Sequence, residues 1–152
     1  MITLRKPKPK DIVMMQELVA PEVASGIILP RSSDEVSTNI RSYTLACDND
    51  EIVGYCALHI HTPNLAEVRS FVVRQDLRGQ GIGSMIVKAL LEEAKFYEIS
   101  QVFTLTYQRK FFERLGFVEI AKSELPAQKI WADCIKCKFF PVCDEIALIY
   151  DI

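Results

Sequence analysis

Apolar positions along the chain switch between the alternating pattern of strands and the wider spacing of amphipathic helices. The alternating runs predict strands at residues 2–5, 43–47, 52–61, 67–73, 102–105 and 145–150, and a further strand that starts at residue 117. Helical spacing is found in a segment that contains Ile12, Met15 and Val19, in a long segment that ends near Tyr97, and at residues 110–115. Strands and helices therefore mix along the whole chain.

Two turns show how neighbouring elements connect. Residues 48–51 are rich in aspartate and asparagine, which favour a tight reversal, so the strands on either side should form a hairpin. Ser32 and Glu35 have the spacing of a capping box, which predicts a short helix at about residues 33–41. The order of elements predicts an α+β fold with a mostly antiparallel sheet and one strand-helix-strand crossover.

The bulk composition fits one domain and excludes some partners. With 152 residues, of which 49% are hydrophobic, the chain can bury one continuous core, and we expect a single domain over residues 1–152. A formal charge of −2 argues against a surface that binds nucleic acid. No apolar stretch is long enough to span a bilayer, so we expect a cytoplasmic protein without membrane contact.

The stretch RGQGIGS, residues 78–84, places three glycines just before the long helical segment. A helix start offers unpaired backbone N–H groups and the positive end of the helix dipole, so a loop that leads into it can bind an anion. Glycines would clear side chains from the rim, and Arg78 would add a positive charge. The spacing fits neither the dinucleotide fingerprint nor the P-loop, so it predicts another kind of anion site.

The segment from Val72 to Ser84 resembles the acyl-CoA motif of the GNAT acetyltransferases, whose loop pattern R/Q-x-x-G-x-G is matched by Arg78, Gly81 and Gly83. The later run FFERLGF, residues 111–117, strengthens the resemblance. It implies the GNAT fold, a mostly antiparallel mixed sheet with helices on both faces, and acetyl-CoA as cosubstrate. The residues that it implies for coenzyme A binding are Phe71, Val72, Val73, Arg78, Gly79, Gln80, Gly81, Ile82, Gly83 and Ser84.

Several segments resemble one GNAT branch, the short N-acetylglutamate synthases. They are GIILPRS (26–32), LAEVRSFVV (65–73), LTYQRKFFERLGF (105–117) and the tail at 125–145. The resemblance implies an acetyl-CoA-dependent N-acetyltransferase that acetylates the α-amine of L-glutamate, a reaction of arginine biosynthesis. Larger members carry an amino-acid-kinase domain that binds arginine, and we do not expect that control here because this domain is missing.

The strand at residues 67–73 carries the candidate chemistry for an amine acceptor. An amine must lose a proton before it attacks a thioester, and the resemblance implies Glu67 as the base. Strand alternation places Glu67, Arg69 and Phe71 on one face, so a carboxylate and a guanidinium share it. An ion pair between Glu67 and Arg69 that only orients the site is the alternative interpretation.

Glutamate also needs cations for its two carboxylates. The resemblance implies Arg31 as the residue that binds one of them, and a solvent-facing Arg31 is the alternative. Arg69, on the same strand face as Glu67, is a further substrate-binding candidate. Lys129 is a weaker candidate for the other carboxylate. Many GNAT enzymes have a tyrosine as general acid where this chain has Phe112, which cannot donate a proton. Tyr107 could replace it, and an ordinary loop tyrosine is the alternative.

Cysteines are unevenly placed in the chain. Cys134, Cys137 and Cys143 cluster in an extra segment before the last strand, and the odd total of five fits a secreted disulfide framework poorly. Three thiolates at this spacing could hold a structural Zn²⁺ that orders the segment. The alternative is three reduced cysteines packed with nearby aromatic residues. The neighbouring histidines His59 and His61 alternate on their strand and are interpreted as surface or cleft residues.

The sequence therefore predicts direct acetyl transfer to an amino acid, and it leaves a monomer and a homodimer as alternatives. Two alternatives remain open at this point. The acceptor could be glutamine or another small amine, because the glycine loop specifies only the donor. The chain could also be a non-catalytic acyl-CoA-binding module, since Phe112 replaces the usual general acid.

Overall fold

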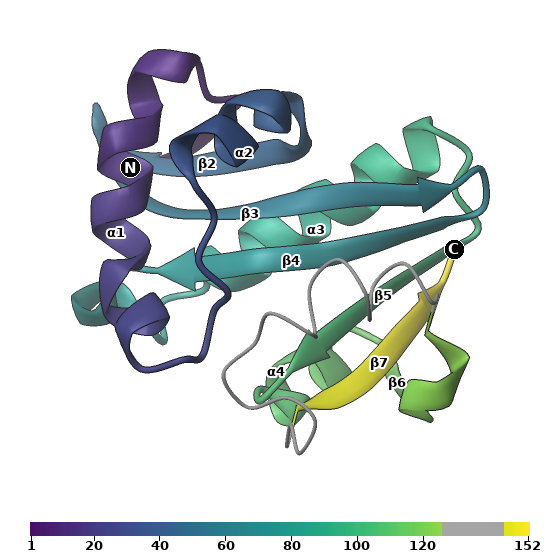
Figure 1. Ribbon diagram of the computed structural model, residues 1–152. Helices are drawn as coiled ribbons and strands as arrows, with labels where there is room; N and C mark the ends of the chain where they lie inside the picture. Colours follow the sequence, from purple (N-terminus) through teal and green to yellow (C-terminus); the bar gives the residue numbers. More distant parts are fainter. Residues whose placement is uncertain (126–144) are drawn as a thin grey trace.

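The computed structural model describes residues 1–125 and 145–152, which form a seven-stranded mixed sheet with helices on both faces (Figure 1). The strands are β1 (Ile2–Arg5), β2 (Tyr43–Asp48), β3 (Glu51–Thr62), β4 (Leu65–Val73), β5 (Gln101–Thr106), β6 (Val118–Ile120) and β7 (Ile146–Asp151). Their order in the sheet is β1-β2-β3-β4-β5-β7-β6. Within the described residues only β4 and β5 pair in parallel, so the predicted α+β class and mostly antiparallel sheet are confirmed.

Two apolar layers hold the helices on the sheet. The helices are α1 (Ile12–Ala24), α2 (Ser33–Thr38), α3 (Ile82–Phe96) and α4 (Arg109–Arg114). One buried cluster joins α1 and α2 to the face formed by β2, β3 and the end of β4, with Met15 and Leu45 among its most buried members. The other joins α3 and α4 to the opposite face, around Ile86, Leu90 and Phe112. Figure 1 shows α1 and α2 in front of the sheet and α3 behind it.

The helix α2 is shorter than the sequence predicts. Its capping box is present, because Ser32 Oγ accepts a hydrogen bond from the N–H of Glu35 at 3.1 Å. The helix ends at Thr38 rather than continuing to residue 41, and a 3-10 turn follows at Ile40–Ser42. Asn39 stops the helix: its backbone leaves the helical conformation, and its side-chain amide donates to the carbonyl of Glu35 at 2.9 Å.

The strands β4 and β5 form a fork. They pair at Leu65 with Gln101, Ala66 with Val102 and Glu67 with Phe103, and then diverge (Figure 1). At the point of divergence, Thr104 Oγ1 donates a hydrogen bond to the carbonyl oxygen of Val68 at 2.9 Å, so a side chain takes over from the backbone ladder. The fork opens a space between two strands of one continuous sheet.

A β-bulge in β4 corrects the predicted facing of its side chains. Two residues of β4, Ser70 and Phe71, lie opposite the single residue Cys56 of β3, and Ser70 has a φ of 55°. The extra residue breaks the alternation, so Val72 packs in the cluster under α1 and Phe71 packs against the cluster under α3. The prediction that Phe71 shares a face with Glu67 is therefore wrong.

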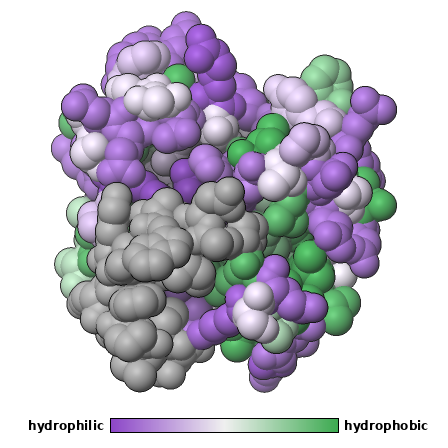
Figure 2. All heavy atoms as spheres, turned by 45° about the vertical axis from the view of Figure 1, so that its right-hand side comes forward, coloured by the Kyte–Doolittle hydropathy of each residue, from purple (hydrophilic) through white to green (hydrophobic). Residues whose placement is uncertain are grey.

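Figure 2 shows one face of the molecule, on which hydrophilic residues predominate and hydrophobic residues gather in a patch beside the residues drawn in grey. Among the helices of residues 1–125 and 145–152, none has the length and apolar character needed to cross a membrane.

Cys47 and Cys56, the two isolated cysteines, are buried free thiols, and burial raises the pKa of Cys56.

An ion pair fixes the start of α1 to the first strand. Arg5 Nη1 and Nη2 donate to Asp11 Oδ2 and Oδ1 at 3.0 and 3.1 Å, and the N–H of Lys8 donates to Oδ2 at 2.7 Å. Asp11 is buried, and the hydrogen bonds from Arg5 hold its pKa below the ordinary value of 3.8. A group whose pKa is lower in the folded state stabilises the fold above its unfolded value and loses this effect as the pH falls.

We predict that Asp11→Asn lowers the free energy of unfolding by about 1–3 kcal/mol near neutral pH, because it removes charge-assisted hydrogen bonds. The difference from the wild type should shrink progressively below about pH 4, where the wild-type carboxylate gains a proton. Urea unfolding followed by circular dichroism at several pH values measures both effects. Asp50→Asn in the exposed β2–β3 turn is the matched control and should change stability little. A difference that persists undiminished in acid would contradict the assignment.

Candidate active site

The loop that leads into α3 places two glycines in a left-handed backbone conformation. Gly79 has a φ of +82°, and Gly81, the N-cap residue of α3, has a φ of +84°. Side chains other than hydrogen are strained there, so the path of the loop requires glycine at both positions. The N–H of Met85 donates to the carbonyl of Gly81 at 3.1 Å, and the amides of residues 82–84 precede this first helical bond. Such amides at a helix start can bind an anion.

The third glycine, Gly83, serves packing rather than loop conformation. A Cβ at this position would lie 2.7 Å from Cζ of Phe71 and 3.4 Å from Cζ of Phe111. The two phenyl rings are stacked with their centroids 5.3 Å apart. Glycine therefore lets the first turn of α3 approach Phe71 in the bulge of β4 and Phe111 on α4.

A groove of about 520 Å³ lies along this loop. It is lined by the predicted coenzyme A residues with the exception of Gln80, which is exposed on the loop. The opposite wall comes from α4 and its flanks, through Gln108, Phe111, Arg114 and Leu115. The structure thus brings the predicted donor residues together around one cavity of the size that binds small molecules.

Arg78 is already paired in this structure. Its Nε donates to the carbonyl of Val73 at 3.0 Å, and its Nη2 forms an ion pair with Oε1 of Glu22 on α1. The backbone carbonyl of Glu22 accepts the N–H groups of Ile27 and Ile28 at 2.9 and 3.3 Å. Glu22 therefore connects the glycine loop with the segment that follows α1.

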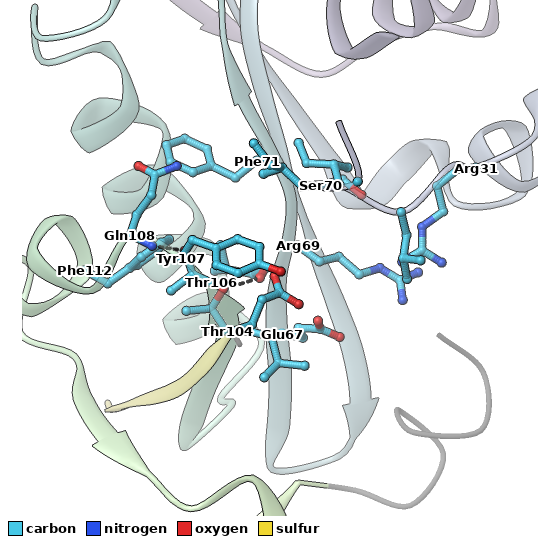
Figure 3. A pocket seen from close by; sticks show the side chains of 17 residues that line it. Arg31, Glu67, Arg69, Ser70, Phe71, Thr104, Thr106, Tyr107, Gln108 and Phe112 are labelled. Atoms are coloured by element: carbon cyan, nitrogen blue, oxygen red, sulfur yellow. Dashed lines mark hydrogen bonds between the residues drawn. The ribbon is translucent and has the colours of Figure 1, made fainter. Parts of the chain in front are cut away.

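A second cavity of about 220 Å³ lies between the diverging strands β4 and β5 and is covered by residues 26–31. It shares Ile27, Ile28, Phe71 and Gln108 with the groove, so the two spaces are contiguous. Four of the side chains predicted for acceptor binding and catalysis line it: Arg31, Glu67, Arg69 and Tyr107 (Figure 3). These residues come from three separate segments of the chain, and the fork brings them together.

Two arginines supply positive charge to this cleft. The side chain of Arg31 is only 14% exposed, which is unlike a solvent-facing arginine, and its Nη1 lies 3.7 Å from Oε2 of Glu35. Figure 3 shows Arg31 and Arg69 reaching toward the same end of the cleft. Both charges also act on Tyr43. Burial raises the pKa of this tyrosine, and the charges of Arg31 and Arg69 and a hydrogen bond with Ser70 offset only part of the rise.

Glu67 is a buried carboxylate at the point of the fork. The residue is 1% exposed, and its Oε1 lies 2.9 Å from Nε2 of His61. Glu67 is the last residue of β4 that pairs with β5, opposite Phe103. Before Glu67, β4 is paired with β5, and after Glu67 the two strands diverge. The fork therefore holds this carboxylate in the wall of the cleft.

Phe112 and Tyr107 have different environments. Phe112 is 1% exposed and packs edge-on against Phe71, Phe111 and Phe117, so it belongs to the core. Tyr107 is 43% exposed and lines the cleft just after β5. In Figure 3 its ring extends over the cleft with the hydroxyl on the side of Glu67. A proton donor in this region is thus available from Tyr107 and not from Phe112.

Some predicted residues fall outside the part of the chain that the structure describes. Lys129 and the three clustered cysteines Cys134, Cys137 and Cys143 belong to residues 126–144. Among residues 1–125 and 145–152, no group of three histidine, cysteine, aspartate or glutamate side chains could hold a metal ion. The predicted zinc site therefore stays a prediction.

Sequence reasoning named His61 only as a surface or cleft residue and missed its contact with Glu67, and it missed the polar side chains at and just after the end of β5. His61 contacts Glu67, and Thr104, Thr106 and Gln108 line the cleft. The pairing of β3 with β4 was a signal for His61. His59 lies directly opposite Glu67 in the hairpin, so the histidines of β3 lie close to this carboxylate. A bulge at His61 brings this residue to Glu67 as well, and alternation alone does not reveal a bulge.

Comparison with known sequences agrees with the motifs. The profile described as "Acetyltransferase (GNAT) family" matches residues 15–117. An uncharacterized N-acetyltransferase of Chlorobaculum tepidum is 34% identical over 146 residues, which are 96% of this chain and 94% of the relative. An amino-acid acetyltransferase of Mycobacterium tuberculosis is 30% identical over 152 residues, covering 98% of this chain and 79% of the relative.

Two solved structures have the same fold. N-acetylglutamate synthase from Neisseria gonorrhoeae, complexed with coenzyme A and N-acetyl-glutamate, has a TM-score of 0.88 and 20% identity over 99% of this chain and 35% of its own. A Mycobacterium tuberculosis protein in complex with CoA and NLQ has a TM-score of 0.84 and 25% identity, with 99% of each chain covered. With the family profile and the sequence relatives, they confirm the predicted GNAT fold. The chain belongs to the acetyltransferase (GNAT) family and is an N-acetyltransferase.

Proposed function

We propose that this enzyme transfers acetyl from acetyl-CoA directly to the α-amine of L-glutamate, the reaction of arginine biosynthesis that forms N-acetylglutamate. The observation that carries the proposal is the composition of the cleft: one buried carboxylate, Glu67, and two arginines, Arg31 and Arg69, in a cavity that adjoins the glycine-loop groove. A dicarboxylic amino acid needs two cationic partners and one proton acceptor. The cleft contains this set.

The groove fits the phosphate-rich donor. Its rim has left-handed glycines, the backbone amides at the start of α3, and Arg78, while Phe71, Leu77 and Phe111 give an apolar lining. Bound acetyl-CoA would supply the activated thioester. The chain's own residues would hold the donor at the loop and leave the acetyl end at the opening between β4 and β5, where the two cavities meet.

The reaction needs one proton acceptor and one proton donor. An amino acid enters as an ammonium ion, which must lose one proton to become a nucleophile. Its nitrogen then bonds to the carbonyl carbon, the carbon–sulfur bond breaks, and the second nitrogen proton balances the leaving thiolate. We assign the first proton to Glu67 and delivery of the second to Tyr107. The backbone amide near Val72 would stabilise the oxyanion.

Support for the glutamate assignment comes from the arginines and from the relatives together. The side chain of Arg31 lines the cleft and is mostly shielded from solvent. The relative from Mycobacterium tuberculosis is named an amino-acid acetyltransferase, and the neighbour from Neisseria gonorrhoeae was solved with N-acetyl-glutamate. Glutamine, which lacks the second charge, is the closest competitor by chemistry, so the assignment has to be tested against it.

The acceptor assignment predicts that glutamate gives the highest kcat/KM in a panel of amino acids assayed with acetyl-CoA. Arg31→Ala should raise the KM for glutamate by roughly 10–100-fold, because a charge-assisted hydrogen bond to a carboxylate is lost. The KM for acetyl-CoA should stay unchanged. Arg41→Ala, at an exposed arginine on the 3-10 turn after α2, is the matched control. An unaltered glutamate KM in Arg31→Ala, or equal use of glutamine, would overturn the assignment.

The donor assignment predicts that Gly81→Ala weakens coenzyme A binding by about 10-fold or more, since the left-handed backbone costs a non-glycine residue roughly 1–2 kcal/mol. Isothermal titration with coenzyme A measures the effect without any acceptor. Met85→Ala, in the same first turn and 41% exposed, is the control and should bind coenzyme A like the wild type. Undiminished binding by Gly81→Ala would contradict the role of the loop.

The base assignment predicts that Glu67→Gln lowers kcat by about 100-fold or more while it leaves coenzyme A binding intact, because the amide cannot take up the ammonium proton. Steady-state kinetics at saturating acetyl-CoA and titration with coenzyme A give the two values. Glu119→Gln, a half-exposed glutamate of β6 outside both cavities, is the control. Wild-type turnover in Glu67→Gln would remove Glu67 from the mechanism.

A further inference from the structure

The contact between His61 and Glu67 is a buried charge-bearing pair. The side chains of His61 and Glu67 are 9% and 2% exposed, and Nε2 lies 2.9 Å from Oε1. A carboxylate removed from water is costly unless it accepts hydrogen bonds. An ionised carboxylate carries no hydrogen, so in that state the hydrogen of this bond belongs to Nε2 of His61. The imidazole then donates to Glu67.

The surroundings of the imidazole fix its orientation. A bulge in β3 places His61 between Ile60, which pairs with Ala66, and Thr62, which pairs with Leu65. One side of the ring stacks on Phe103 of β5, with centroids 5.5 Å apart and planes at 29°. His59 meets the ring edge-on at 4.6 Å. Packing against Phe103 of β5 and His59 of β3 thus holds the donor nitrogen against Glu67.

We propose that His61 is a positioning residue, which holds Glu67 in the ionised form and in the orientation needed to take a proton from the acceptor. The inference rests on the proposed role of Glu67 as the base. A hydrogen bond to the charged form of a carboxylate favours that form, so a buried Glu67 can remain a base near neutral pH. Packing against Phe103 contributes the orientation.

Other titratable groups face this pair from the surrounding elements. His59 lies on β3 opposite Glu67, and Arg69 follows on the same face of β4. Tyr107 after β5 and Glu145 before β7 line the cavity together with Glu67. These groups contribute to any pH profile of the enzyme. The test therefore compares variants that differ only at position 61.

The experiment uses two substitutions of similar length, one with a hydrogen-bond donor and one without. His61→Gln retains an N–H group, whereas His61→Met fills similar space without one. The pH dependence of kcat is measured with saturating acetyl-CoA and the amino acid that the panel identifies as the best acceptor. Thermal unfolding and coenzyme A titration establish that each variant is folded. Ile60→Gln, at the neighbouring 45% exposed position, is the control.

We expect the acid limb of the kcat profile to move to higher pH by about 1–2 units in His61→Met, because loss of a hydrogen bond to a charged group favours the protonated carboxylate. In His61→Gln the limb should lie close to the wild-type position, and Ile60→Gln should match the wild type. If His61→Met does not fold, His61→Asn, whose shorter amide cannot reach Glu67, replaces it in the comparison with His61→Gln.

Two results would overturn the inference. An acid limb in His61→Met that coincides with the wild type would show that His61 does not influence Glu67. Equal shifts in His61→Met and His61→Gln would show that the ring acts by packing alone. The Glu67→Gln variant separates these failures from failure of the proposed function: if it is inactive, Glu67 is still the base, and if it turns over normally, the base assignment itself is wrong.

Discussion

The site depends on a short parallel pairing between two strands that then separate. β4 and β5 share only three paired positions in the structure, and the ladder ends at Glu67 and Phe103. Parallel strands require a crossover, and here the crossover is the glycine loop and α3. The pairing therefore places the start of α3 beside the end of β4, while the separation opens the cleft. The hydrogen bond from Thr104 to Val68 lies at the position where the pairing ends and the separation begins.

The sequence predicts the elements well because their signals are local. Alternating apolar residues predict the strands, and the three glycines before an amphipathic segment predict the start of α3 and an anion site there. The bulge at Ser70 gives no such signal, because serine does not favour a φ of 55° and only the surrounding sheet imposes it. That one residue reverses the faces of Phe71 and Val72 relative to strict alternation. The sequence therefore identifies the glycine motif but not the direction in which the side chains of Phe71 and Val72 point.

Contacts between distant segments account for the remaining differences. Arg78 was expected as a flanking charge, but its partner Glu22 lies 56 residues away on α1, and no local pattern links the two. His61 was interpreted as a surface or cleft residue, yet the hairpin register and a bulge bring it to Glu67. The resemblance predicts Arg31 and Glu67 for the acceptor site, and the position of Tyr107 just after a strand makes it a candidate proton donor; the fork places all three around one cavity. The spatial arrangement of these residues follows from the pairing of the strands in the sheet, which no local sequence pattern shows.

Glu22 connects the walls of the two cavities. Its carboxylate holds Arg78 at the rim of the donor groove, and its backbone carbonyl holds the N–H groups of Ile27 and Ile28. These two residues line both cavities, and Arg31 follows them in the same segment. An anion at the glycine loop attracts Arg78 and repels the carboxylate of Glu22. An anion in the proposed donor groove would therefore act on the segment that carries Arg31, which is a physical reason for the two proposed sites to respond together.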